Sequence, residues 1–372
     1  MKWSRERTTI LTAVAVTLTA CSDGLGPDTA SFDAVETQAN VQTVDAVFSA
    51  AAWESFEALG GMFIAGSPVA GALAQHSADL LIAGTMPDAE ERERVMGMIA
   101  SEIVAAIESP SLSLVPIISE NVRGTTFVFD PTLDRYVADP ELTGAPANGV
   151  RYILYAINPI TREPLVDNEI GYADIIDLDS PSANGISLHF LAVSDGVTHL
   201  DYTVTTERTD ESGTIAVSGS VTNGTDTLEF TINIAGMSTT AGQTVDVNFS
   251  VDIVGRNFGF DLVFAGVKQG GAESSEISLT VNAGPNIIVM ERSGTPAAYT
   301  VSITVNGELF ATVTGNPTGI VITGAGDRVI TPEEAEALRR MLGLIPRSVD
   351  ALQGLMRPVH RIIQLAVLSN VL

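Results

Sequence analysis

The sequence contains very little cysteine and very little lysine. Cys21 is the single cysteine in 372 residues, so the chain can form no internal disulfide and no metal site built from several thiolates. Lysine occurs only as Lys2 and Lys268, and acidic residues outnumber Lys and Arg by 45 to 19, which gives a net charge of −26. A field of this sign repels nucleic acids and anionic lipid headgroups, and we therefore exclude nucleic-acid binding and a polybasic membrane-binding patch.

Motifs that carry known chemistry are also missing. The four histidines, His76, His189, His199 and His360, are scattered, and no H-E-x-x-H pair exists to hold zinc. The chain has no G-x-S-x-G elbow, no G-x-x-x-x-G-K-[ST] loop and no G-x-G-x-x-G at the start of a helix. We therefore assign no catalytic residue and no cofactor, and the enzyme that remains conceivable is a hydrolase whose residues meet only in space.

The N-terminus has the pattern of a secretory signal. Lys2, Arg5 and Arg7 precede an uncharged apolar run over residues 8–20. As a helix this run rises only about 20 Å, short of the roughly 30 Å hydrocarbon core, so we expect it to be removed and not to span a membrane.

The residues at the end of this run, Leu18-Thr19-Ala20-Cys21, resemble the lipobox of bacterial lipoproteins. The resemblance implies that signal peptidase recognises Leu18, Thr19 and Ala20 and that the Cys21 sulfur carries a diacylglyceryl group. Ser22 follows the cysteine, and Asp23 lies one place beyond the position where aspartate favours retention in the inner membrane. The resemblance therefore implies lipid anchoring in the cell envelope, with the outer membrane favoured; an ordinary signal peptide with a cysteine near its cleavage site is the alternative.

Composition and periodicity divide the rest of the chain. Residues 21–42 are rich in Gly, Pro, Ser, Thr and Asp and predict a flexible tether. Residues 43–120 predict a helical segment, with helices from Thr43 to Gly61, over residues 68–83 and over residues 88–107. Residues 331–372 predict two C-terminal helices: Thr331-Pro-Glu-Glu334 forms a capping box, Gly343 ends the first helix, and the second begins near Ser348 and bends at Pro358.

Between these helical parts, residues 121–330 have the period of two that is typical of strands. In Val245–Ile253 every second residue is Val, Phe or Ile and the residues between are Asp, Asn or Ser, so one sheet face is apolar and the other is wet. Turn sequences such as Asn306-Gly307 separate successive runs and predict hairpins, and Asp130 and Asn158 each precede a proline in two similar loops. We predict an α+β, mainly β, fold: a large curved antiparallel meander with the N-terminal helices and the C-terminal helix pair packed on it, residues 43–372 forming one domain.

Two groups of aspartates are weak candidates for calcium sites. Neither has the spacing of an EF-hand loop, and chance clusters are expected in so acidic a chain. The candidates are Asp130, Asp134 and Asp139 in one hairpin and Asp174, Asp177 and Asp179 in the next.

Two noncatalytic functions fit this pattern. The first is a membrane-anchored envelope lipoprotein that acts as a scaffold or binding module for other envelope components. The alternative is a periplasmic carrier that holds lipid or another apolar ligand in a cavity between sheet and helices. The sequence does not decide whether the helices fill the concave side of the sheet or leave it open.

Overall fold

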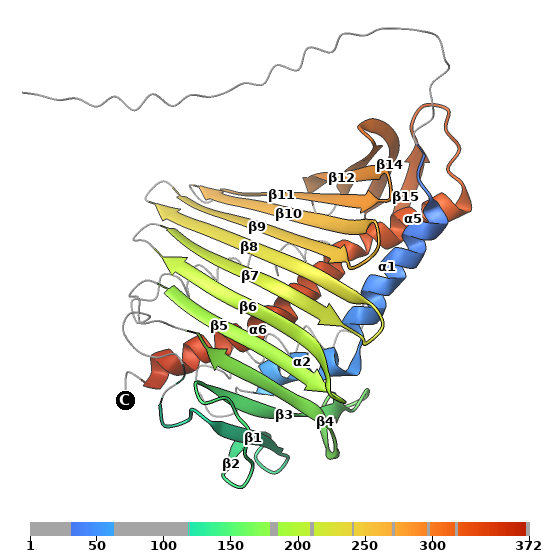
Figure 1. Cartoon of the computed structure of the whole chain (residues 1–372). Coiled ribbons are helices and arrows are strands. Elements are labelled where there is room, and N and C mark those ends of the chain that lie inside the picture. Colours follow the sequence, from blue (N-terminus) through green and yellow to red (C-terminus); the bar gives the residue numbers. More distant parts are fainter. Residues whose placement is uncertain are drawn as a thin grey trace, which may run out of the picture.

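One large sheet with helices on one of its faces forms the body of the protein (Figure 1). The computed structural model describes residues 31–62, 118, 120–178, 185–208, 212–239, 242–269, 272–295, 298–316 and 319–369. The fifteen strands are β1 (Thr125–Asp130), β2 (Arg135–Asp139), β3 (Gly149–Ile157), β4 (Pro164–Asp177), β5 (Gly185–Ser194), β6 (Val197–Arg208), β7 (Ser212–Thr222), β8 (Thr227–Thr239), β9 (Gly242–Ile253), β10 (Phe258–Gln269), β11 (Ala272–Ala283), β12 (Asn286–Thr295), β13 (Ala298–Val305), β14 (Glu308–Asn316) and β15 (Gly319–Gly324).

The predicted antiparallel meander is confirmed. From β3 to β15 every strand pairs antiparallel with its neighbour in sequence, and the sheet is open, with β2 and β15 at its two edges. The exception lies at the β2 edge, where β1 pairs with β3 in parallel and β2 lies outside β1. The period-two pattern did not predict this crossover, because it carries no information on strand order.

Side-chain alternation fixes which face of the sheet is buried. Val247, Phe249 and Val251 of β9 are almost fully buried, whereas Asp246 and Asp252 point to solvent. The same parity holds across β5 to β10, so the apolar side chains form one continuous core that faces the helices. We call this the inner face and the opposite side the outer face.

The predicted turns have the expected backbone. Asn306 and Gly307 both have positive φ (52° and 85°) and join Val305 directly to its partner Glu308, as a two-residue hairpin requires. Asp130 accepts hydrogen bonds from the backbone N–H groups of residues 132 and 133, and Asn158 does the same for residues 160 and 161. The two Asx-Pro loops are therefore built alike, as predicted.

The predicted boundaries at the N-terminal end were wrong. Helix α1 (Ala34–Phe48) begins within the range 21–42 assigned to a tether, and Phe32 is already buried in the core. Asp33 caps this helix by accepting a hydrogen bond from the N–H of Glu36 at 2.9 Å. The segment from Thr43 to Gly61 is not one helix either, because the chain turns at Ser49 and continues as α2 (Ala51–Met62). The helices predicted over residues 68–83 and 88–107 lie outside the described residues.

The predicted C-terminal helix pair is present. Helix α5 (Pro332–Leu342) begins with the capping box of Thr331 and Glu334 and ends at Gly343. Helix α6 (Leu344–Ser369) starts directly after it, four residues before the predicted start, and is bent, with Pro358 in its interior. No helix among the described residues has the length and hydropathy needed to cross a membrane.

Helices from both ends of the chain cover the inner face together. Helix α1 packs against α5 and reaches β7 and β8, and α2 packs against α6 and against β3 to β6 (Figure 1). The indole of Trp53 in α2 lies so close to Gly354 of α6 that a Cβ there would come within 2.9 Å of the ring. Glycine at this position permits the two helices to approach each other.

Three aromatic rings join α2 to the middle of the sheet. Phe56 points its ring edge at Phe190 and Tyr202, which stack on each other with centroids 4.7 Å apart. The buried hydroxyl of Tyr202 donates a hydrogen bond of 2.9 Å to the backbone carbonyl of Leu355 in α6. Pro358 disturbs the regular bonding of this helical turn, because it has no N–H and its ring crowds the preceding turn. A side chain from the sheet thus satisfies a carbonyl next to the helix bend.

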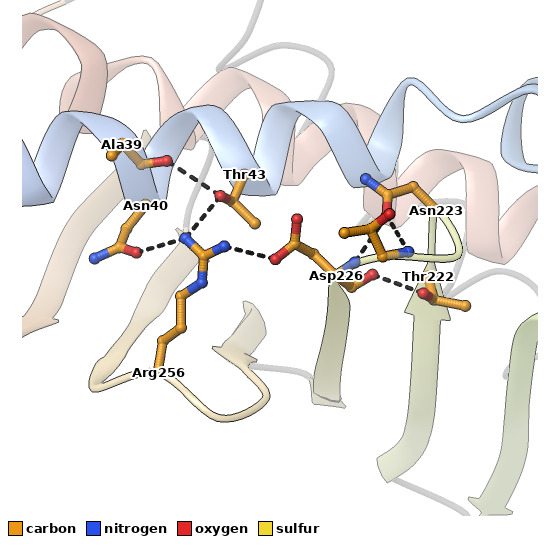
Figure 2. A network of polar contacts seen from close by, with 8 residues as sticks. Ala39, Asn40, Thr43, Thr222, Asn223, Asp226 and Arg256 are labelled. Carbon is orange, nitrogen blue, oxygen red and sulfur yellow. Dashed lines mark hydrogen bonds and ion pairs between the residues drawn. The ribbon is translucent and has the colours of Figure 1, made fainter.

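Arg256 fastens α1 to two loops at one end of the strands (Figure 2). Its guanidinium donates to Asn40 Oδ1 at 3.1 Å and to Thr43 Oγ1 at 2.9 Å, both on α1, and forms an ion pair of 2.6 Å with Asp226. Asn223 in turn accepts from the backbone N–H of Asp226 and holds that loop in place. Two buried polar residues of α1, Asn40 and Thr43, therefore have a specific partner on the loops of the sheet.

Replacing Tyr202 with phenylalanine tests the junction of sheet and helix. We expect Tyr202→Phe to lower the free energy of unfolding by about 1–3 kcal/mol, because it removes a buried hydrogen bond between the sheet and α6. Urea unfolding followed by circular dichroism measures the change. Tyr299→Phe, at a half-buried tyrosine, is the control and is expected to cost less than about 0.5 kcal/mol; equal losses in the two variants would contradict this role of the hydroxyl.

Candidate interaction surface

The outer face is a broad surface of short polar side chains. Strand register places them in rows that run across the sheet, one of which contains Ser218, Thr231, Ser250, Asp261 and Thr280. A second row contains the polar residues Asn233, Asn248 and Ser278 together with the apolar residues Ala216 and Val263. Because most of these side chains are short, the outer face is fairly flat. A partner could contact its hydroxyl, amide and carboxylate groups across several strands.

Carboxylates give this face its charge. Those on the outward side of β6 to β11 are Asp201, Glu207, Glu229, Asp246, Asp252, Asp261 and Glu276.

Three of these carboxylates stand close together. Glu229 lies directly opposite Asp252 in the β8–β9 pair, and like charges in this position destabilise a sheet. Partial burial, together with the negative charges of Asp261 and Glu229, raises the pKa of Asp252 above its ordinary value. Ser250 donates a hydrogen bond of 2.5 Å to Asp261 and thereby stabilises that carboxylate. The cluster is thus a negative patch on the outer face, near the end of the sheet where β9 turns into β10.

The described histidines have structural partners. His189 Nε2 lies 2.7 Å from Asp201 Oδ1 on the outer face, and His199 Nδ1 lies 2.9 Å from the carbonyl oxygen of Thr222. His76 and the side chain of His360 lie outside the described residues. His189 thus engages a carboxylate on β6, and His199 contacts a backbone carbonyl on β7.

The first group of calcium candidates does not converge. Asp130 pairs with Arg135 at the turn of the β1–β2 hairpin, whereas Asp139 pairs with Thr126 at the other end, about 13 Å away along the strand. Asp130 caps its own loop, and Asp139 accepts from the N–H of Glu141. Asp134 occupies the turn with φ of 49°.

The second group is engaged by arginine. Asp174 is buried and forms two bonds of 2.7 Å with Arg151, the residue opposite it on β3. Asp177 is buried and pairs with Arg123 at 2.8 Å. Asp179 lies outside the described residues. In the part of the chain that the structure describes, no three His, Cys, Asp or Glu side chains gather as metal ligands.

A small pocket lies where α1, α2 and α6 meet. Its volume is about 280 Å³ and its lining residues are Asp45, Phe48, Ser49, Trp53, Glu57, Arg347, Asp350 and Ala351. Asp45 pairs with Arg347 at 2.7 Å and Glu57 with Arg357 at 3.5 Å. Burial raises the pKa of both carboxyl groups, and their arginine partners reduce that rise. Charged and apolar side chains line this pocket in similar measure, and none of them comes from a strand, unlike the apolar cavity beside the sheet that the carrier hypothesis requires.

Sequence reasoning did not identify these ion pairs. Asp174 and Arg151 are separated by 23 residues, and Glu57 and Arg357 by 300. The alternating strand pattern predicted that polar residues lie on the outer face. It did not indicate that carboxylates of different strands lie opposite each other.

The proposed lipidation residues, Leu18 to Cys21, lie outside the described residues. Comparison of the chain with protein-family models, with curated proteins and with solved structures finds no match. A functional proposal for this chain therefore depends on its own residues and their geometry.

Removing the charge of Asp252 tests the repulsion on the outer face. Its raised pKa means that ionisation disfavours the folded state, so the loss of stability sets in as pH rises from the unfolded pKa through the folded pKa. We expect Asp252→Asn to stabilise the protein by about 0.2–1 kcal/mol at pH 7 and to have no such effect near pH 3. Added salt should shrink the gain at pH 7.

Asp246→Asn is the matched control, because Asp246 lies on the same strand and face but has Ala235 and Ala265 as cross-strand neighbours. Thermal melts at both pH values measure the difference. A gain as large in the control as at Asp252 would show that the local carboxylate cluster is not its cause.

Proposed function

We propose that the chain is an envelope lipoprotein, exported and anchored by a lipid on Cys21, that serves as a noncatalytic scaffold or binding module. The observation that carries the proposal is the asymmetry of the sheet: the inner face is buried under helices of the same chain and the outer face is open to solvent across its middle strands. An outer face with rows of polar groups suits reversible contact with other envelope components.

The N-terminal residues support the anchoring part of this proposal. Phe32 is the first buried residue in the described part of the chain, and residues 22–31 separate it from Cys21. A ten-residue segment spans at most about 36 Å, which would keep the domain near the membrane surface. Two or three acyl chains give stable attachment where one gives only marginal binding. Because the acidic domain repels anionic headgroups, the lipid and not the protein surface would provide membrane affinity.

The outer membrane is the proposed location. Ser22 stands where the sorting rule requires aspartate for inner-membrane retention, and removal of residues 1–20, with Lys2, Arg5, Arg7 and Glu6, would leave a net charge of −28. The folded domain would then repel other acidic surfaces and select neutral or cationic partners.

Burial of the inner face favours this scaffold role over the carrier alternative. Ile232, Phe249 and Leu279, on three strands of the central sheet, are at most 1% exposed. A ligand-sized apolar cavity would leave some of these side chains accessible. Native mass spectrometry of a chain that begins at Ser22, purified without detergent, discriminates further: a stoichiometric bound lipid would favour the carrier.

Changing Cys21 tests the anchor. In a bacterial host fed an alkyne-labelled fatty acid, we expect the full chain to incorporate the label and to sediment with membranes, and Cys21→Ser to lose both properties, because no other thiol exists to receive the lipid. Ser22→Ala is the control and should keep the label. Unchanged labelling of Cys21→Ser would refute the lipid anchor.

The second residue tests the location. In a host that uses the aspartate rule, Ser22→Asp should move the labelled protein from outer-membrane to inner-membrane fractions, while Ser22→Ala should not move it. A protein found in the inner membrane before any substitution would contradict the proposed location.

A further inference from the structure

The two edges of the open sheet differ in their protection against strand addition. An edge strand exposes unpaired N–H and C=O groups, and proteins commonly block such edges with charges or short strands. Strand β2 has both devices, since it is five residues long and carries Arg135 and Asp139 at its ends. Its hairpin also packs on the neighbouring strands, where Tyr136 donates to the carbonyl oxygen of Ile153 at 2.9 Å.

Strand β15 is also short, with six residues, but it lacks the charged residues that protect β2. Its sequence from Gly319 to Gly324 is GIVITG, with no charge and no proline, and within the described residues it pairs only with β14. Two of its apolar side chains are exposed: Val321, on the outer side, is 62% exposed, and Ile320, on the inner side, is 42% exposed. The next inner residue, Ile322, packs against the core, so the apolar layer of the sheet continues to the very edge.

Charge is also unevenly distributed along the sheet. Strands β13, β14 and β15 contain a single charged residue, Glu308, whereas β6 to β11 carry the carboxylates of the outer face. Two copies of a chain with net charge −26 repel each other in most orientations. The β15 edge is the place on the sheet where two copies can meet with the fewest carboxylates opposed.

We infer that a second copy of this chain adds to β15 in antiparallel orientation, so that the two sheets continue into each other across a two-fold axis. Antiparallel addition of identical strands is self-complementary, because each copy supplies the same donors and acceptors to the other. It pairs the free backbone groups of both edges and covers Ile320 and Val321. The inference is independent of the proposed lipid anchor, since it concerns the folded domain.

Sedimentation velocity of the lipid-free chain that begins at Ser22, from about 1 to 100 µM, tests the inference. We expect a dimer whose fraction rises with protein concentration and with salt, because salt screens the repulsion between two acidic copies. Val321→Glu should weaken the association constant at least tenfold by placing a charge on each edge. Val321 is exposed, so this variant should keep the melting temperature and circular dichroism spectrum of the parent chain.

Ser218→Glu is the matched control, because it adds the same charge on the outer face of β7, between Thr203 and Thr231. It should change the association constant less than twofold. Hydrogen exchange should show that the backbone amides of residues 320–323 become protected as dimer forms. A chain that stays monomeric at 100 µM in high salt would overturn the inference, as would a Val321→Glu variant that dimerises like its parent. Amides of residues 320–323 that are already protected in the monomer would also overturn it, because another segment of the same chain would then cover this edge.

Discussion

The need to cover one face of a very wide sheet governs this structure. Strands with strict alternation produce an inner face of Val, Ile, Leu and Phe that cannot remain in water, and the helices that cover it come from opposite ends of the chain. Tyr202 connects the sheet to both helices. Its ring stacks on Phe190 and contacts the ring of Phe56 in α2, and its hydroxyl donates a hydrogen bond to the carbonyl oxygen of Leu355 in α6. Burial raises the pKa of Tyr202 well above its ordinary value, so the hydroxyl remains a donor at physiological pH.

Within the described residues, the sheet has its inner face covered by helices and leaves its outer face and its two edges open to interaction. The outer face differs from the β15 edge in chemistry: one is polar and acidic, the other apolar and uncharged. They would therefore select different partners, the outer face through hydrogen bonds and charge and the edge through backbone pairing. Because the two surfaces do not overlap, the proposed pairing of two copies at β15 would leave the outer face accessible to a different partner.

Much of the fold could be predicted from local patterns. The alternation in Val245–Ile253, the Asn306-Gly307 turn and the capping box of Thr331 and Glu334 all depend on neighbours in sequence, and all are confirmed. The start of α1 was missed because Thr37, Asn40 and Thr43 interrupt its apolar period, although Asp33 followed by Glu36 was a usable capping signal. Those polar residues are buried, and Asn40 and Thr43 face Arg256, more than 200 residues away in the chain. The ion pairs of Asp174 and Asp177 escaped prediction for the same reason: they depend on tertiary neighbours that periodicity does not reveal.

The meeting of the two chain ends also determines the order in which the molecule can assemble. Successive hairpins form between sequence neighbours, so most of the sheet can build from local contacts. The helices that cover the sheet cannot all pack through local contacts, because they come from opposite ends of the chain. The side chain of Gln38 in α1, for example, donates a hydrogen bond to the carbonyl oxygen of Glu333 in α5, 295 residues later. The entropy cost of so long a loop grows only logarithmically with length, but the partner does not exist until synthesis is nearly complete. Helices α1 and α2 are made before the sheet, but the inner face lacks the contacts of α6, including the hydrogen bond from Tyr202 to Leu355, until the last residues of the chain are synthesised.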